Sequence, residues 1–298
     1  MCDVIEVRPL RKNEESVWLS LGGEVASGRL DSNAFTAALG REDERAFLLA
    51  FDGIRCVGRL RGRFLNPRLY YVADVTVPEP AGFREVARSL AAFLSNSFAE
   101  DDTEVLAWDR EASRPVNSAL ESAGFVVGRR KVFVERDLSD HAPRSKHELE
   151  FRSLAKLGED RFLEIMTEAS TGDPFEESSD RDPRGEFREL RDYAGKKFDP
   201  TWWSVAYAGG RPIGVLLPQE FADRDGEGTL FYVAVLPAER GHGYGRLLHA
   251  EGLAFLARNG ITHYVGSTDT RNTPMLRVFE ANGCRVTGTQ LFFKALKR

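Results

Sequence analysis

Apolar positions along the chain follow two periods, and their succession predicts strands and helices in a regular order. Short runs rich in Val, Leu and aromatic residues predict buried strands, whereas apolar residues three or four positions apart predict helices that pack on a sheet. From Phe83 to Phe98, one helical face carries Val86, Leu90, Phe93, Leu94 and Phe98. The pattern therefore indicates a sheet that is covered by helices.

The first half of the chain begins with a strand and two helices and then alternates strands with helices. The predicted strands are Val4–Arg8, Ala46–Phe51, Cys56–Phe64, Leu69–Val77 and Val105–Trp108. The predicted helices are Asn13–Gly28, Ser32–Gly40, Phe83–Phe98 and Pro115–Ala123. A strand pair from Val126 to Arg136 completes this half, and the polar stretch 138–147 is typical of a linker.

The second half repeats this order. Its predicted strands are Glu148–Arg152, Trp202–Tyr207, Ile213–Leu217, Thr229–Leu236 and Ile261–Gly266. Its predicted helices are Glu159–Ala169, Glu186–Tyr193, Tyr244–Asn259 and Pro274–Asn282, and terminal strands follow to Phe293. The same succession of elements in both halves suggests an internal repeat.

The two halves align without gaps when one is shifted by 159 residues. In this register Pro78 coincides with Pro237, Gly82 with Gly241, Pro115 with Pro274, and Gly124 with Gly283. A single match of this kind is expected by chance, but four matches in one register, each at the same predicted element, indicate a duplicated domain. The length of 298 residues also suits two domains.

The stretch from Phe231 to Gly260 is the most informative part of the chain. An apolar strand ends at Pro237, a proline that has no N–H to donate to a sheet. A helix then begins near Tyr244, and between the two lies Arg-Gly-His-Gly-Tyr-Gly, residues 240–245. Several backbone N–H groups can converge at such a turn, where the helix dipole adds partial positive charge. The sequence therefore predicts a phosphate-binding loop.

The spacing of the glycines separates the kinds of nucleotide-binding loop. A P-loop needs Lys-Ser or Lys-Thr after its last glycine, and none follows here. A dinucleotide-binding loop needs a glycine three residues beyond Gly243, and none is present. Arg240, Gly243 and Gly245 instead fit Arg-x-x-Gly-x-Gly. With the preceding strand and Pro237, this loop resembles motif A of the GNAT N-acetyltransferase superfamily, which binds the pyrophosphate of coenzyme A.

The resemblance covers nearly the whole chain once the repeat is considered. It implies an α/β fold with a mixed sheet, arranged as two tandem GNAT-type domains, each a mostly antiparallel central sheet flanked by helices. The expected domains are a degenerate GNAT-like domain at 1–137, a linker at 138–147 and an acyl-CoA-binding domain at 148–298. The implied cosubstrate is acetyl-CoA or another acyl-CoA, with no metal.

The family's mode of binding can be carried over to matching residues. It implies that the pantetheine arm pairs with the fourth strand of the second domain and the pyrophosphate with the glycine loop. The implied coenzyme-binding residues are Val233, Ala234, Val235, Arg240, Gly241, His242, Gly243, Tyr244, Gly245, Arg246, Asn272 and Phe279. For Asn272, a helix N-cap is an equally good interpretation.

The residues that move protons are less clearly marked. Acetyl transfer needs a base for the attacking amine, and Glu227, Asp269 and Asp173 are the carboxylates considered, although each also suits a turn or a solvated loop. Many family members carry a Tyr in the last helix as the acid for the departing thiolate. Phe279 stands there in this chain. Tyr264, Ser267 or water remain as donors, and a thiolate can also leave without one.

The first half has lost the features of the loop. Ala-Gly-Phe-Arg-Glu-Val, residues 81–86, stands opposite residues 240–245, and Glu85 would repel phosphate. We interpret this half as a structural partner without coenzyme. A second, altered cofactor site is the alternative.

Three aromatic residues lie before or at the start of the second strand of the second half. They are suited to core packing or, alternatively, to forming a wall of the acceptor site: Phe198, Trp202 and Trp203.

Composition narrows the classes of function that remain. A formal charge of −5 argues against a dominant nucleic-acid surface. The sequence shows neither a signal peptide nor a membrane span, and its three scattered cysteines suit a reducing cytoplasm. We expect a cytoplasmic monomer or homodimer.

Three functions fit these observations. The first is an acyl-CoA-dependent N-acyltransferase that acts on a small-molecule amine. The second is a non-catalytic acyl-CoA sensor, which the phenylalanine at position 279 keeps open. The third is a GNAT-fold enzyme of other chemistry, such as aminoacyl-tRNA-dependent transfer or acyl-CoA decarboxylation.

Overall fold

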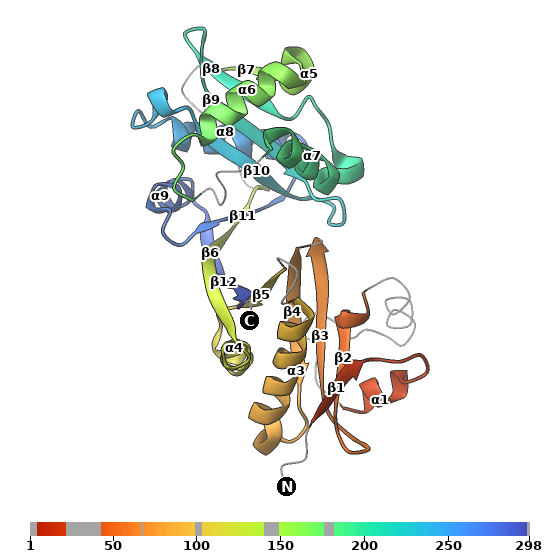
Figure 1. The fold of residues 1–298 in the computed structure, drawn as a ribbon. Coiled ribbons are helices and arrows are strands. Elements are labelled where there is room, and N and C mark those ends of the chain that lie inside the picture. The colour runs from red at the N-terminus through yellow and green to blue at the C-terminus, as the bar shows by residue number, and fades with distance from the viewer. Residues whose placement is uncertain are drawn as a thin grey trace. The chain divides into compact units, whose positions relative to one another are not determined.

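The computed structural model describes residues 5–21, 43–66, 68–98, 103–139, 149–175 and 182–296. The predicted helix Ser32–Gly40 and most of the linker 138–147 lie outside these ranges. The chain divides into two compact units, Met1–Lys131 with Gly288–Arg298, and Val132–Thr287. Each unit contains β-strands and its own hydrophobic core (Figure 1).

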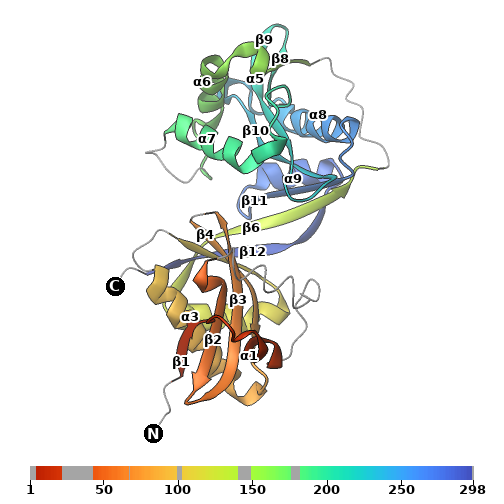
Figure 2. The same ribbon diagram turned by 90° about the vertical axis from the view of Figure 1, so that its right-hand side faces the viewer.

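The first unit has the strand order β1-β2-β3-β4-β5-β12. The strands are β1 (Glu6–Pro9), β2 (Phe47–Asp52), β3 (Arg55–Asn66), β4 (Leu69–Thr76), β5 (Glu104–Trp108) and the end of β12 (Arg285–Ala295). The helices are α1 (Glu15–Ser20), α3 (Phe83–Phe98) and α4 (Arg114–Ser122). Figure 2 shows α1 and α3 beside the strands of this unit.

The core of the first unit confirms the helical face that the apolar spacing predicts. Val86, Leu90, Leu94 and Phe98 of α3 are buried against the sheet, and Phe93 is partly buried at the edge of the same cluster. Residues at i, i+4 and i+8 lie on one side of a helix, so these side chains reach the sheet together.

The second unit has the strand order β6-β11-β10-β9-β8-β7. Its strands are the end of β6 (Phe125–Asp137), β7 (Glu150–Ser153), β8 (Ser204–Ala208), β9 (Arg211–Glu220), β10 (Glu227–Val235) and β11 (His263–Asp269). Its helices are α5 (Leu154–Leu157), α6 (Glu159–Ser170), α7 (Pro183–Ala194), α8 (Tyr244–Arg258) and α9 (Thr273–Ala281).

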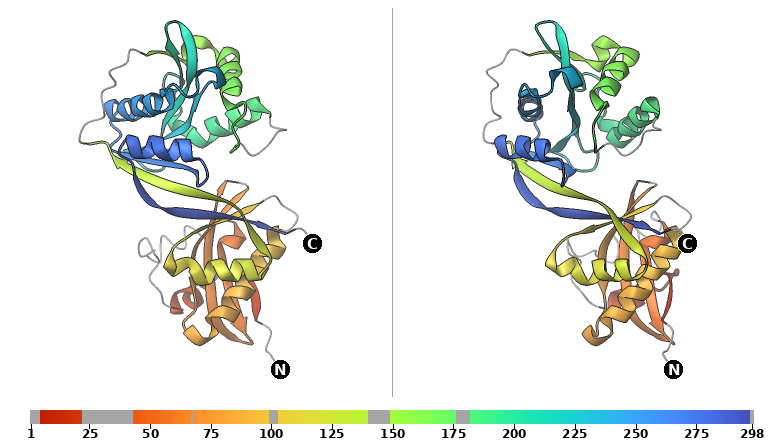
Figure 3. Two further views of the ribbon diagram at one scale, coloured as in Figure 1. Left: turned by 90° about the vertical axis from the view of Figure 1, so that its left-hand side faces the viewer. Right: turned by 60° about the vertical axis from the view of Figure 1, so that its left-hand side comes forward.

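Helices cover both faces of the strands of the second unit. Figure 3 shows α6 and α7 in green on one side of the strands and α8 in blue on the other. On the first side, Phe162 and Phe187 form a cluster with Trp203. On the other, Leu248 of α8 packs on Ala206 and Ile213. A ligand at the sheet therefore meets different helices from the two faces.

Among the strand pairs whose registers are described, each unit has one that is parallel. In the first unit β4 pairs with β5 from Leu69↔Glu104 to Tyr71↔Leu106, and in the second β10 pairs with β11. The other strand pairs whose registers are described are antiparallel. The predicted mixed sheet flanked by helices is confirmed.

The repeat is visible in the bounds of corresponding elements. Helix α4 covers Arg114–Ser122 and α9 covers Thr273–Ala281, so both ends are shifted by the predicted 159 residues. Strands β4 and β10 end at Thr76 and Val235, which is the same shift.

The last strands differ from the expectation. The sequence predicts a strand pair from Val126 to Arg136 and several terminal strands, whereas β6 and β12 are each one long strand. A hairpin needs a turn, but Gly128 and Gly288 do not take the left-handed φ that the turn glycines elsewhere adopt. The compact units divide the chain within these strands, so the ranges 1–137 and 148–298 stay a prediction about the duplicated segments.

The helices are short. The 16-residue α3 is the longest within the described ranges. None of the helices in those ranges is long and apolar enough to cross a membrane.

Candidate active site

Strands β10 and β11 pair only where they begin. The parallel register covers Glu227↔His263 and Gly228↔Tyr264 and then ends. Strand β10 continues to Val235, and there its other edge is still paired with β9 at Gly214. From Thr229 onward, the edge of β10 that faces β11 is thus not paired with that strand. This edge offers backbone N–H and C=O groups to an extended ligand.

A bulge interrupts β10 in the same region. The register with β9 shifts between Leu230 and Tyr232, which leaves Phe231 as the extra residue. As a result Phe231 and Tyr232 both pack on the α6 and α7 side, although neighbouring strand residues normally point to opposite faces. Val233 and Val235 pack on the α8 side, and Ala234 on the α6 and α7 side. In the middle of β10, the bulge therefore changes the direction in which the backbone N–H and C=O groups point.

The glycine loop leads from β10 into α8. After a short 3-10 turn at Pro237–Glu239, Gly241 and Gly243 both have φ of +82°. Gly243 is the N-cap of α8 with ψ of 1°, and a Cβ at either glycine would meet nothing within 4 Å. Positive φ favours glycine here, and the space beside the loop is open. The loop thus has the conformation and the room that a phosphate group requires.

The first turn of α8 adds favourable electrostatics. It holds no acidic residue, and Gly243 gives no side-chain cap to its N–H groups. Those N–H groups have no partner within the helix, so they can bind an anion. Tyr244 packs on the α8-side cluster, and Gly245 approaches Val235 closely enough that a Cβ would lie 3.8 Å from it. Arg246 lies in this turn and supplies a formal positive charge.

Arg240 is hydrogen-bonded to three backbone carbonyls, and its contact with a coenzyme stays a prediction. Its Nε donates to the carbonyl of Val235 at 3.1 Å, and one terminal nitrogen donates to the carbonyls of Ala169 and Thr171 at 3.0 and 2.9 Å. These last carbonyls lie at the end of α6. Arg240 therefore ties the loop after β10 to the loop after α6. His242 is exposed, and its Nδ1 lies 3.3 Å from the carbonyl oxygen of Glu239.

Two of the three carboxylates considered as bases, Glu227 and Asp269, are paired with arginine. Glu227 forms an ion pair with Arg224 and lies at the closed end of the β10–β11 pair. At ~3.3 Å per residue, this is roughly 26 Å along the strand from Val235. Asp269 binds Arg271 at 2.9 Å, and its side chain is 10% exposed. The structure does not bring these two carboxylates together.

Asn272 is engaged as a helix cap. Its Oδ1 accepts from the N–H of Met275 at 3.2 Å, and its Nδ2 donates to Thr268 Oγ1 at 3.0 Å. The alternative that the sequence left open, an N-cap of α9, is therefore observed. Contact with a coenzyme remains a prediction.

Tyr264 and Phe279 lie in the core around a histidine that the sequence analysis overlooked. His249 of α8 is fully buried, Tyr264 is 1% exposed and Phe279 is 3% exposed. The Nε2 atom of His249 lies 3.1 Å from Tyr264 Oη, and the ring of Phe279 packs on the imidazole at 5.3 Å. A lone His within the apolar run Leu-Leu-His-Ala, residues 247–250, was the available signal.

Asn282 fixes the state of this histidine. Its Nδ2 donates to the carbonyl of Arg246 at 3.1 Å and to Nδ1 of His249 at 2.9 Å. His249 must then carry its proton on Nε2 and donate it to Tyr264. Burial lowers the pKa of His249 to about 3, and burial also raises the pKa of Tyr264. The cluster is neutral at physiological pH, and Tyr264 holds its proton strongly.

Helix α7 packs on the side of β10 to which Phe231 of the bulge points. Its Phe187 packs on Trp203 at 5.5 Å, and Phe198 lies 4.9 Å from the same indole ring. Trp203 is fully buried, so its structural role is core packing. Trp202 instead contacts Phe255 of α8 at 5.3 Å.

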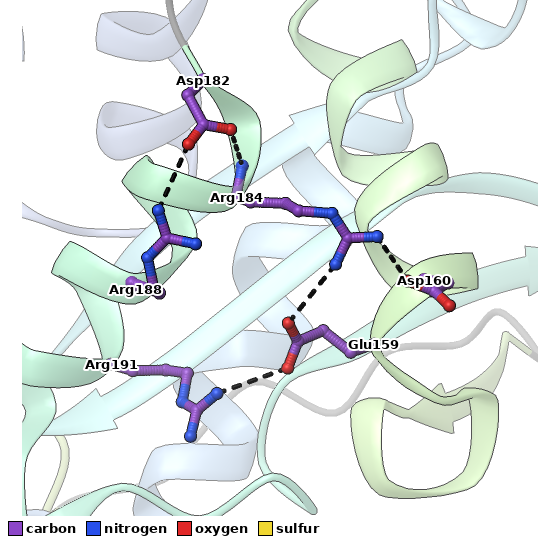
Figure 4. Close-up of polar contacts among 6 residues, drawn as sticks. All are labelled: Glu159, Asp160, Asp182, Arg184, Arg188 and Arg191. Atoms are coloured by element: carbon purple, nitrogen blue, oxygen red, sulfur yellow. Dashed lines mark hydrogen bonds and ion pairs between the residues drawn. The ribbon is translucent and has the colours of Figure 1, made fainter.

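Ion pairs hold α7 against α6, as Figure 4 shows. Arg184 bonds Asp160 at 2.5 Å, and Arg191 bonds Glu159 at 3.3 Å. Arg188 bonds Asp182, whose Oδ1 accepts from the N–H of Arg184 and caps the helix. The loop after α6 also belongs to this side, where Asp173 Oδ1 accepts from the N–H of Phe175. That carboxylate therefore stabilises a turn.

Comparison with known proteins identifies the second unit. Residues 162–284 match the model of the acetyltransferase (GNAT) family. The mycothiol acetyltransferase of Thermobispora bispora is 33% identical over 90 residues, which are 29% of this chain and 30% of that protein. The mycothiol acetyltransferase of Acidimicrobium ferrooxidans is 28% identical over 209 residues, or 67% and 66% of the two chains. The chain thus spans from under a third to about two thirds of these relatives.

Solved structures extend the likeness to both units. A GCN5-related N-acetyltransferase from Sphaerobacter thermophilus superposes with a TM-score of 0.63 at 18% identity, covering 98% of this chain and 96% of that one. A tandem GNAT protein from the clavulanic acid biosynthesis pathway gives 0.54 at 17% identity and covers 99% of both. At these identities the likeness shows the fold, and it confirms the predicted tandem arrangement.

The protein therefore has a tandem GNAT fold. Its second unit contains a domain of the acetyltransferase (GNAT) family at residues 162–284. The resemblance carried by Arg240, Gly243 and Gly245 is confirmed at the level of the family.

Proposed function

We propose that this chain is an acyl-CoA-dependent N-acyltransferase that moves an acetyl group from acetyl-CoA to the amine of a small molecule. One observation carries the proposal. The edge of β10 that is not paired with β11 runs from the bulge at Phe231 directly into the glycine loop and the start of α8. A ligand with an extended amide arm and a pyrophosphate matches both parts of this path.

The residues of the path fit that ligand. Backbone groups of Val233 to Val235 would pair with the arm, and the N–H groups after Gly243 would bind the phosphates. Gly241 and Gly243 leave the approach open because no Cβ closes it. The bound thioester supplies the acyl group and a good leaving group. N–H groups at the bulge are suited to stabilise negative charge that develops on an oxygen atom there.

Proton transfer is the less defined part of the proposal. The reacting amine must be neutral, and a free ammonium with a pKa of ~10.4 needs a base. Glu227 and Asp269 are each paired with an arginine, and in this proposal either one acts on the amine through water. Tyr264 and Phe279 are unsuited as acids, because the first is buried with a raised pKa and the second has no hydroxyl. A thiolate whose thiol has a pKa of ~8.5 can leave without protein help.

Release of free thiol tests the proposal. Purified protein is incubated with acetyl-CoA and a broad panel of small primary amines. The expected result is amine-dependent thiol release with at least one amine, and acetylation of that amine by mass spectrometry. Binding of acetyl-CoA without turnover of any amine would refute the enzymatic proposal.

A non-catalytic acyl-CoA-binding protein is the second candidate. The observation that favours it is the phenylalanine at position 279, which packs against His249 at the position where the resemblance to the GNAT family implies a tyrosine. This candidate predicts tight binding of acetyl-CoA together with an inert wild type, which is the opposite outcome of the same assay.

A further inference from the structure

An exposed aromatic ring stands beside the bulge of β10. Tyr193, at the end of α7, is 55% exposed, and its ring centroid lies 5.4 Å from that of Phe231. Within the described ranges, the other exposed large apolar side chains are aliphatic. Tyr193 and Phe231 together form a surface that we name the aromatic platform.

The aromatic platform is supported from behind. Phe231 lies 6.3 Å from the buried ring of Trp203, which itself packs on Phe187 and Phe198. The ion pairs of Figure 4 hold α7, which carries Tyr193, on α6. A ring fixed in this way loses little conformational entropy when it binds a ligand.

The two flanks of α7 differ in charge. Arg184, Arg188 and Arg191 are spaced by four and three residues, so they share one flank, and each is paired with a carboxylate. Glu189 precedes Tyr193 by four residues and is exposed, which places a carboxylate on the flank of Tyr193. The flank of the helix that carries the platform is therefore acidic, whereas the arginines lie on the other flank and are each paired with a carboxylate.

The direction from which the amine approaches the thioester follows from the proposed function. The glycine loop and α8 occupy one face of the sheet, and the coenzyme arm would run along β10 to the bulge. An amine must then reach the thioester from the face covered by α6 and α7. The aromatic platform is on that face at the bulge itself.

We propose that Tyr193 determines acceptor specificity. The aromatic platform binds the flat apolar face of a six-membered ring that carries the reacting amine, and the acidic flank attracts the ammonium form. This inference rests on the proposed function for the position of the thioester, but the recognition of a ring can be measured without turnover.

Matched pairs of amines test the platform. Cyclohexylamine is compared with the linear 2-aminohexane, and glucosamine with its open-chain counterpart 2-amino-2-deoxyglucitol, so that both members of each pair carry the amine on a secondary carbon and differ in the ring. We expect the wild type to have a higher kcat/KM for the cyclic member of at least one pair. Tyr193→Ala should lower that value roughly 3- to 10-fold through KM, with little change for the linear amine. Tyr193→Phe should retain the preference.

Controls separate this inference from the proposed function. Val286→Ala removes an apolar side chain of β12 that is 60% exposed, and it should change kcat/KM for neither the cyclic nor the linear amine. If no amine is turned over, the proposed function fails, and saturation-transfer NMR of the same pairs with coenzyme A present decides the platform. Stronger transfer to the cyclic amine that is lost in Tyr193→Ala supports it. Equal transfer, no transfer to either amine, or an unchanged preference in Tyr193→Ala overturns it.

Discussion

Replacing Gly243 by aspartate places a negative charge where the phosphates are proposed to bind. The residue is the N-cap of α8, with φ of +82°, and a Cβ there would meet nothing within 4 Å. The variant should therefore fold. Its cost is the left-handed conformation, about 1 to 2 kcal/mol for most residues and less for Asp and Asn, which tolerate this region. Gly243→Asn has nearly the same shape without the charge and serves as the matched control.

The size of the effect follows from Coulomb's law. A carboxylate on the N-cap would lie ~5 Å from a phosphate bound to the first N–H groups of α8. At an effective dielectric constant of ~20, two unit charges at that distance repel by about 3 kcal/mol. This energy corresponds to a loss of roughly 100- to 200-fold in affinity. The asparagine variant loses only what its side-chain volume takes from the approach.

Calorimetric titration with acetyl-CoA measures both variants against the wild type, and thermal unfolding shows that each is folded. We expect the dissociation constant of Gly243→Asp to exceed that of Gly243→Asn by about two powers of ten. The difference should shrink as salt is added, because the repulsion is electrostatic. Equal affinities for the Asp and Asn variants would show that the phosphates bind elsewhere.

Two further predictions concern the buried cluster. Phe279 is 3% exposed and packs on His249, so Phe279→Leu should change the rate of thiol release only modestly, and Phe279→Tyr should not raise it greatly. A large gain by Phe279→Tyr from an inert wild type would instead favour the non-catalytic acyl-CoA sensor. For His249, the folded pKa of about 3 lies below the ordinary value of 6.5 for histidine. Its unfolded form thus takes up a proton first as the pH falls, and the free energy of unfolding should drop by up to about 1.4 kcal/mol per pH unit from pH ~6.5 to ~5. Denaturant titrations of the wild type and His249→Gln check this, and an equally steep slope in the variant would contradict it; Glu14, with a pKa of about 2, acts only at lower pH.

The fold was largely predictable because its elements follow local periodicity. Helix α3 has the predicted bounds, Phe83–Phe98, and α8 ends one residue before the prediction. The register of the repeat was also readable, since turn glycines and prolines mark the element ends. The long strands β6 and β12 were not predicted. Whether a glycine such as Gly128 turns the chain or continues a strand depends on pairing with distant segments, which has no local signal.

The candidate site was predictable in its backbone and not in its side chains. Positive φ at Gly241 and Gly243 follows from residue type and context. Arg240 was predicted to bind the coenzyme from its place in the motif, but the sequence did not reveal that two of its carbonyl partners lie about 70 residues away in sequence. The pairing of His249 with Asn282 and Tyr264 likewise depends on how α8, α9 and β11 meet. Such contacts are set by tertiary packing, which a single sequence does not display.

The contrast between the two glycine loops predicts the number of coenzyme sites. In the first unit, Gly82 ends a 3-10 turn without the left-handed φ of Gly241 and Gly243, and the first turn of α3 carries Glu85. Both differences oppose phosphate binding, because the N–H groups do not converge in the same way and the carboxylate repels an anion. We therefore predict that only the second unit binds acetyl-CoA.

The most direct test of the account is the stoichiometry of acetyl-CoA binding to the intact chain, measured by isothermal titration calorimetry. The predicted result is one coenzyme per chain in the wild type, with this single site weakened by Gly243→Asp. Two equivalent sites, no measurable binding, or one site that is unaffected by Gly243→Asp would contradict it.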